Sequence, residues 1–124
     1  MTQSQEDYLE MVGFLSEKNG EVRVTDIAAE LGFSKPSVSA ALKTLEEKDL
    51  VRHERYGSVI LTEKGRALSA EISGKHGLLK DFLANVLGVS PGIAEKDACK
   101  MEHILSSETF DKLRKFLKKT GKKI

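Results

Sequence analysis

The chain has 124 residues, of which 40% are hydrophobic and 31% are charged, and its formal net charge is +1. A chain of this length can bury a modest core and has room for one or two small domains, which excludes large multidomain enzymes. Its apolar runs fall short of the roughly 18 to 20 residues that a membrane span requires, and its polar start lacks a signal-peptide pattern, so we expect a cytoplasmic protein. The single Cys99 cannot form an internal disulfide, which argues against a secreted, disulfide-stabilised scaffold.

The charge is distributed unevenly along the chain. Residues 1–73 carry 9 Lys and Arg against 13 Asp and Glu, whereas residues 74–124 carry 11 against 6. Residues 34–66 carry 7 basic and 5 acidic side chains, so this segment is locally cationic within an acidic half. Because a DNA-binding surface must offset phosphate charge, we expect any DNA contact to lie in this segment.

The first 48 residues predict three helices, of which the last two form a helix-turn-helix. Apolar side chains recur at helical spacing over residues 5–18. A short amphipathic helix capped by Thr25 is expected to end at Gly32, which suits the tight turn that follows. The next helix is expected over residues 34–48, with an apolar stripe on one side. Two short helices joined by a glycine turn are typical of DNA-binding domains.

Two short strands are expected next, over residues 50–55 and 58–61, and they would form a β-hairpin wing. The preceding helix would then place its first residues in the DNA major groove. We expect short or apolar side chains there to approach base edges and long cations to contact phosphates. The predicted base-contacting residues are Lys35, Pro36, Ser37 and Ala40, the predicted phosphate contacts are Lys43, Arg52 and Arg55, and Ser39 lies on the same outward face.

The second half of the chain is expected to be all helical, which makes the fold mainly α with a small β-wing. Helices are expected over residues 63–73, 78–87 and 91–105 and in a last segment that follows Ser106 or Ser107. Gly74 is expected to separate the first two of them. The apolar face of the second helix is wide enough to require a partner helix, and we expect it to build the core of a homodimer. Its core residues would be Leu78, Leu79, Phe82 and Leu83, together with helix faces after Pro91.

Three side chains with metal-binding chemistry are closely spaced in the segment 91–105. Cys99, Glu102 and His103 stand at i, i+3 and i+4, which would place them on one face of one helix. A thiolate, a carboxylate and an imidazole are usual ligands for a borderline divalent ion. Further candidate ligands from two other elements are Asp7, Glu10 and His76. Together these residues predict a divalent-metal site near the junction of the two domains.

Five stretches of the chain carry a resemblance to a known family. They are Glu6-Asp7-Tyr8-Leu9-Glu10, Asp26-Ile27-Ala28, Leu61-Thr62-Glu63-Lys64-Gly65, Lys75-His76 and Asp97-Ala98-Cys99-Lys100-Met101-Glu102-His103. On these stretches the chain resembles, along essentially its whole length, the diphtheria toxin repressor and manganese transport regulator family of metal-dependent repressors. Because the sequence stops at Ile124, it resembles the short two-domain type without an SH3-like third domain.

The resemblance implies a domain organisation, a cofactor and a partner. Residues 1–65 would form the winged helix-turn-helix domain, and residues 66–124 the helical metal-binding and dimerisation domain. The cofactor would be Mn²⁺ or Fe²⁺, with Co²⁺, Ni²⁺ or Zn²⁺ as substitutes, and the homodimer would bind a palindromic double-stranded DNA operator. The family's metal-ligand positions correspond to Asp7, Glu10, His76, Cys99, Glu102 and His103.

The candidate metal ligands resemble those of two different branches of this family. Asp7 and Glu10 resemble the manganese regulators, whereas Cys99 resembles the iron-sensing repressors. The iron branch also has an ancillary metal site whose carboxylate and histidine positions are occupied here by Lys80 and Glu95. The ancillary site is therefore expected to be absent or altered.

Two other functions remain open from the residues alone. A winged-helix regulator that senses redox state or an organic ligand would use Cys99 as an oxidisable thiol. A small metal hydrolase would hold zinc with Cys99, Glu102, His103 and His76, although the sequence offers no separate general base.

Overall fold

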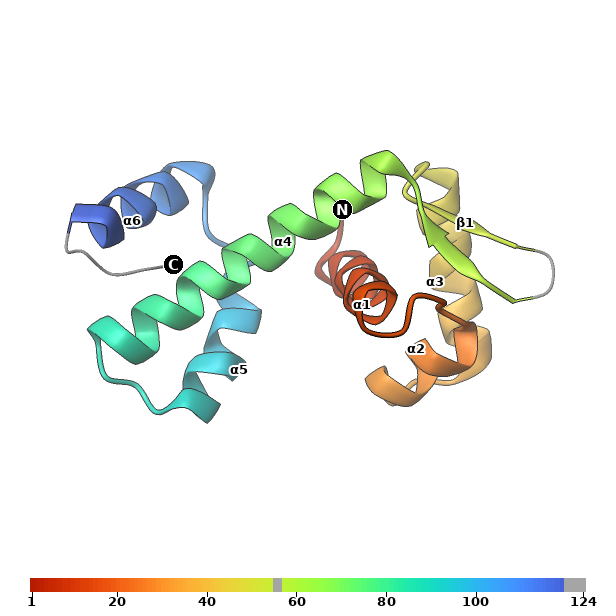
Figure 1. Cartoon of the computed structure of the whole chain (residues 1–124), viewed down its shortest axis with the longest axis horizontal. Helices are drawn as coiled ribbons and strands as arrows, with labels where there is room; N and C mark the ends of the chain where they lie inside the picture. The colour runs from red at the N-terminus through yellow and green to blue at the C-terminus, as the bar shows by residue number, and fades with distance from the viewer. Residues whose placement is uncertain (55–56, 120–124) are drawn as a thin grey trace. The chain divides into compact units, whose positions relative to one another are not determined.

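The computed structural model describes residues 1–54 and 57–119, and the chain divides into two compact units, Met1–Glu71 and Ile72–Ile124. The described residues are mainly helical, with one two-stranded sheet, which confirms the expected fold class (Figure 1). None of the described helices is long and apolar enough to cross a membrane.

The first unit is a winged helix-turn-helix whose core lies between its helices and the sheet. Leu9, Val12 and Ile27 have no exposed surface and hold the first two helices together. The strands are antiparallel, and Arg52 pairs with Ile60 at the centre of the register. The elements are α1 (Gln3–Asn19), α2 (Val24–Leu31), α3 (Lys35–Glu47), β1 (Val51–His53), β2 (Val59–Leu61) and the beginning of α4 (Glu63–Asp81).

Local sequence explains where α3 begins and which face it buries. The hydroxyl of Ser34 accepts a hydrogen bond from the backbone N–H of Ser37, and proline occupies the first turn, where its missing N–H has no consequence. The turn before it ends α2 at Gly32, whose φ of 72° lies in the left-handed region. The residues buried on α3 are Val38, Leu42 and Leu45, at a spacing of four and three residues.

The expected boundaries of α2 and of the wing require correction. The N-cap of α2 is Arg23 rather than Thr25, and its N–H donates to the Asp26 carboxylate at 3.0 Å. The segment before α2 is extended because it pairs with the wing, where Arg23 forms a β-bridge with Ser58. Both strands are shorter than expected, and Arg55 and Tyr56 lie outside the described residues.

The second unit has its own apolar core. It contains the later part of α4, the π-helical segment η1 (Phe82–Val86), α5 (Pro91–Met101) and α6 (Ser107–Lys119). The buried cluster consists of Leu78, Leu79, Leu83, Ala94, Ala98, Phe110 and Leu117. Three of the four residues expected to form a dimer core are thus buried within a single chain, and Phe82 packs against them. A second chain is therefore not needed to cover them, because helical periodicity identifies an apolar face without indicating which element covers it. Their part in a dimer core stays a prediction.

The long helix α4 also differs from the expectation, since it continues through Gly74. Apart from the neighbouring backbone of α4 itself, the described residues place no atom within 4 Å of the position that a Cβ at Gly74 would take. Gly74 is thus an exposed position on a continuous helix. A helical glycine costs only about 1 kcal/mol relative to alanine. The buried side chains of Ile72 and Leu78 on either side of it hold the helix in place.

Two glycines of α4 should therefore respond in opposite ways to alanine. A Cβ at Gly65 would lie 1.9 Å from the Leu50 carbonyl oxygen, which is itself held by the N–H of Thr62 at 3.1 Å. We expect Gly65→Ala to lower the free energy of unfolding by about 1–3 kcal/mol. As the matched control, Gly74→Ala should raise it by about 0.5–1 kcal/mol because it removes chain entropy without a clash. Urea unfolding followed by circular dichroism measures both, and equal effects would contradict the close approach at Gly65.

Candidate DNA-binding face and metal centre

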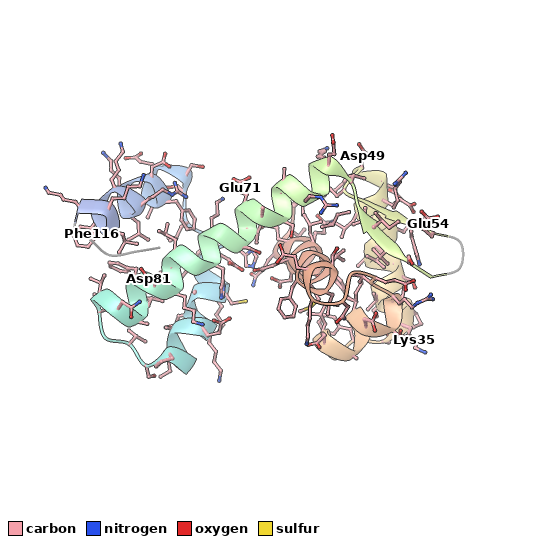
Figure 2. The ribbon with its side chains drawn as sticks, viewed as in Figure 1. Lys35, Asp49, Glu54, Glu71, Asp81 and Phe116 are labelled. Atoms are coloured by element: carbon pink, nitrogen blue, oxygen red, sulfur yellow. The ribbon has the colours of Figure 1, made fainter. Side chains whose placement is uncertain are left out.

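The face of α3 opposite its buried stripe is exposed. Figure 2 labels Lys35 at the start of this helix. Arg52 on β1 is exposed as well, whereas Arg55 lies outside the described residues. The predicted DNA-binding residues that the structure leaves exposed on α3 are Lys35, Pro36, Ser37, Ser39, Ala40 and Lys43. The fold thus presents short side chains and cations together on the outward face of a capped helix.

A polar contact at the base of the wing was not predicted from the sequence. The hydroxyl of Ser58 donates to the Glu21 carboxylate at 2.7 Å, and Arg23 contacts the same oxygen at 3.0 Å. The bond from Ser58 and, after it, the charge of Arg23 hold the pKa of Glu21 below its usual range. Because Glu21 and Ser58 are 37 residues apart, local sequence carries no signal for this pairing.

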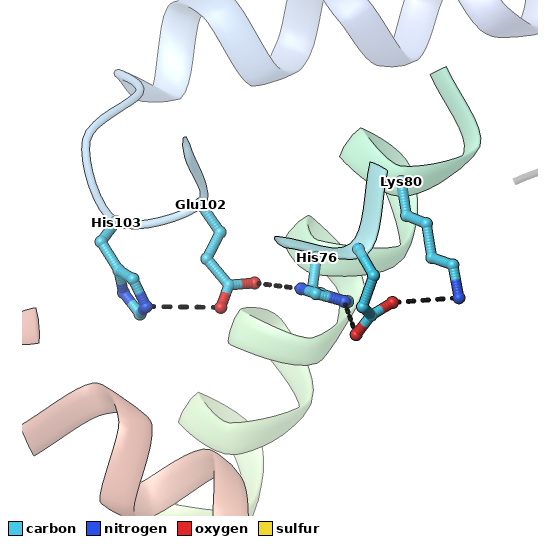
Figure 3. A network of polar contacts seen from close by, with 5 residues as sticks. His76, Lys80, Glu102 and His103 are labelled. Atoms are coloured by element: carbon cyan, nitrogen blue, oxygen red, sulfur yellow. Dashed lines mark hydrogen bonds and ion pairs between the residues drawn. The ribbon is translucent and has the colours of Figure 1, made fainter. Parts of the chain in front are cut away.

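In the second unit a buried carboxylate lies between two imidazoles. The side chain of Glu102 has 0% exposure; its Oε2 lies 3.2 Å from Nδ1 of His76, and its Oε1 lies 3.3 Å from Nε2 of His103 (Figure 3). His103 is nearly as buried as Glu102, with 2% of its side chain exposed. His76 is brought there by α4, and the other two residues come from the end of α5. Three of the six predicted metal ligands are therefore in direct contact.

The chemistry of this group fits a divalent cation. A buried carboxylate is strongly disfavoured unless positive charge balances it. Protons on the two imidazoles could supply that charge, and so could a metal ion bound to their lone pairs. Two imidazole nitrogens and one carboxylate are a donor set that suits borderline divalent metals. We conclude that His76, Glu102 and His103 could hold such an ion.

A second carboxylate contacts the other side of the His76 ring. Oε1 of Glu95 lies 2.9 Å from Nε2 of His76, and Oε2 of Glu95 lies 3.0 Å from Nζ of Lys80 (Figure 3). The hydrogen bond from Lys80 holds the pKa of Glu95 below its usual range, with a smaller contribution from His76 and against the effect of burial. The sequence marked Lys80 and Glu95 as departures from the family pattern but did not indicate that they contact each other.

Of the remaining predicted ligands, two lie on α1 and one lies on α5. Asp7 and Glu10 lie one turn apart on α1 in the first unit, and both are half-buried. Cys99 is exposed on α5.

The expected single helix for Cys99, Glu102 and His103 needs correction. Glu102 is the C-cap of α5, where its N–H still donates to the Ala98 carbonyl, and His103 follows in a turn. The helix stops there because Ser106 already caps α6, accepting from the N–H of Thr109 at 3.2 Å.

These features define a class of protein: a winged helix-turn-helix unit followed by a helical unit with a buried histidine–carboxylate group. Residues 1–59 match the N-terminal DNA binding domain of the iron dependent repressors, and residues 62–123 match the metal binding and dimerisation domain of the same proteins. The chain therefore belongs to the iron-dependent repressor family, which confirms the resemblance. His76, Cys99, Glu102 and His103 all fall within the segment that matches the metal binding domain.

Individual relatives agree with this assignment. The chain is 42% identical over 118 residues to the transcriptional regulator MntR of Escherichia coli, covering 95% of this chain and 76% of that protein. It is 37% identical to an HTH-type transcriptional regulator of Methanocaldococcus jannaschii, with both chains covered completely. The solved structure of the manganese regulator SloR matches with a TM-score of 0.82 and 34% identity, covering 95% of this chain and 55% of the SloR chain. The relatives are transcriptional regulators, which confirms the expectation that this protein is not an enzyme.

From the exposed face of α3 we predict that Lys43 contacts a DNA phosphate. Lys43→Ala should weaken binding to every DNA sequence by a similar factor and lower the slope of log affinity against log salt concentration by about one, since it removes one phosphate contact. Fluorescence anisotropy at several salt concentrations, on a DNA fragment selected by the protein and on an unrelated fragment, measures both quantities. Lys115→Ala, an exposed lysine of α6, is the matched control. An unchanged slope for Lys43→Ala would place this residue outside the DNA contact.

Proposed function

We propose that the protein is a repressor that senses Mn²⁺ or Fe²⁺, binds a palindromic double-stranded DNA operator as a homodimer, and controls metal-homeostasis genes. The observation that carries this proposal is the buried contact of Glu102 with His76 and His103, in a unit that matches a metal binding and dimerisation domain. The exposed α3 face of a matched DNA binding domain supports the second half of the proposal. Similarity to the manganese regulator SloR and to a manganese-dependent transcriptional repressor solved with manganese, at 34% and 27% identity, supports manganese as one physiological metal.

The proposed ligand set extends beyond the buried group. We propose that Asp7 and Glu10 bind the same metal centre from α1, and that Cys99 completes it from α5. Their i, i+3 spacing places Asp7 and Glu10 on one face of α1, and both side chains are half-buried. A site built in this way would take ligands from the DNA-binding unit as well as from the dimerisation unit.

Because the proposed ligands come from both units, metal binding would change the affinity of the protein for DNA. Without metal, clustered carboxylates repel one another, so the protein samples arrangements that do not fit the operator. A bound divalent cation offsets that repulsion. Asp7 and Glu10 then restrict the position of the DNA-binding unit, which raises the population that fits two successive major grooves. By linkage, DNA must raise metal affinity by the same factor, with a coupling of about 1–3 kcal/mol.

The proposed coupling is tested by neutralising the α1 carboxylates. The double variant Asp7→Asn with Glu10→Gln should remain folded and dimeric and should lose the dependence of operator binding on metal. Operator titrations with and without Mn²⁺, together with size-exclusion chromatography, make the measurement. The matched control removes two exposed carboxylates of the same unit, Glu17→Gln with Glu30→Gln. Full metal dependence in the Asp7 and Glu10 variant would overturn the role of α1.

The proposed participation of Cys99 is tested by metal preference. A thiolate favours softer ions such as ferrous iron, cobalt or zinc, whereas a carboxylate favours manganese. Cys99→Glu should therefore shift the ratio of half-activating concentrations toward Mn²⁺ relative to Co²⁺, with Cys99→Ser as the variant that only removes the thiolate. An unchanged ratio would show that Cys99 lies outside the coordination shell. Loss of operator binding on peroxide treatment, with no dependence on metal, would favour the redox alternative.

A further inference from the structure

The His76 ring lies between two carboxylates that differ in exposure. On one side is the buried Glu102, and on the other is Glu95, whose side chain is 51% exposed and paired with Lys80. We propose that Glu95, held by Lys80, is a positioning residue that fixes His76 in the tautomer protonated at Nε2, so that Nδ1 presents its lone pair to the metal. This inference rests on the proposed function, because it assigns the binding atom of one proposed ligand.

The contacts of the ring decide which nitrogen carries the proton. A neutral imidazole has one N–H and one lone pair, and the hydrogen bond made by one nitrogen fixes the role of the other. Glu95 offers an acceptor to Nε2 at 2.9 Å, while Nδ1 faces Glu102 at the longer distance of 3.2 Å. A proton on Nε2 therefore satisfies the shorter contact. It also leaves Nδ1 directed toward the same space as Oε2 of Glu102.

Lys80 binds the carboxylate oxygen of Glu95 that does not contact His76. Its ammonium lies 3.0 Å from Oε2 of Glu95, so one carboxylate oxygen is engaged by Lys80 and the other by His76. Glu95 is thereby held as an acceptor for the ring N–H rather than as a ligand. A carboxylate that accepts from the outer nitrogen of a ligating histidine fixes the orientation of the ring and raises its basicity.

The ion pair of Lys80 with Glu95 contributes little to the stability of the fold. The side chains of Lys80 and Glu95 are 47% and 51% exposed, and ion pairs of this exposure add little to stability. Changing Glu95 should therefore leave the fold intact while altering His76. Loss of such an outer carboxylate typically lowers metal affinity roughly tenfold to a hundredfold.

The test reads the tautomer directly in metal-free protein. Long-range ¹H–¹⁵N correlation spectra of the three histidine rings, assigned with single His→Gln variants, are recorded over a pH series, and the neutral forms are compared at its alkaline end. We expect neutral His76 to carry its proton on Nε2 in the unsubstituted chain and to become a mixture of tautomers in Glu95→Gln, because an amide can accept from Nε2 or donate to it. Asp97→Asn, an exposed carboxylate change on the same helix, should leave His76 unchanged.

A metal titration completes the test and separates it from the proposed function. Mn²⁺ affinity, measured by competition with a fluorescent chelator, should fall at least about tenfold in Glu95→Gln and stay within about twofold in Asp97→Asn. A proton on Nδ1 in the unsubstituted chain, or an unchanged tautomer and affinity in Glu95→Gln, would overturn the positioning role. Failure of the unsubstituted chain to bind Mn²⁺, Fe²⁺ or Zn²⁺ would instead overturn the proposed function, while the tautomer spectra would still decide the role of Glu95.

Discussion

The second unit is organised around one electrostatic requirement, the burial of the Glu102 carboxylate. A carboxylate without exposed surface is costly to bury without polar partners, and the fold places two imidazole nitrogens at 3.2 and 3.3 Å from its oxygens. This placement of the Glu102 carboxylate depends on the end of α5, where Glu102 caps the helix and His103 follows in a turn. It also depends on the later part of α4, which carries both His76 and the buried Leu78.

The first unit separates its core from its outward face on a single helix. On α3 one stripe has no exposed surface, and the opposite face carries lysines, serines and small side chains. The Ser34 cap fixes where that face begins, and the contact of Ser58 with Glu21 ties the wing to the segment before α2. Recognition of DNA needs such a rigid base, because side chains can read base edges only from a fixed register.

The proposed metal ligands of this iron-dependent repressor family member differ in chemical hardness. The matched domains bind DNA and metal and form dimers, while the proposed ligands combine carboxylates, imidazoles and an exposed thiol. Hard oxygen ligands favour manganese, and a thiolate favours softer ions, so small changes in this set alter metal preference. In the proposed site Glu95, paired with Lys80, would add a further influence, because its Oε1 contacts the outer nitrogen of His76.

The sequence by itself determined the winged helix-turn-helix, the all-helical second half and the chemistry of the candidate ligands, because helical periodicity, glycine turns and N-caps are local properties. Tertiary structure decided that Leu78, Leu79 and Leu83 fill a core within one chain, and that α4 is continuous. It also brought Glu95 to His76 across 19 residues. Periodicity identifies an apolar face but not its partner, and an ion pair between distant residues leaves no local pattern, so these contacts exist only once the helices have packed.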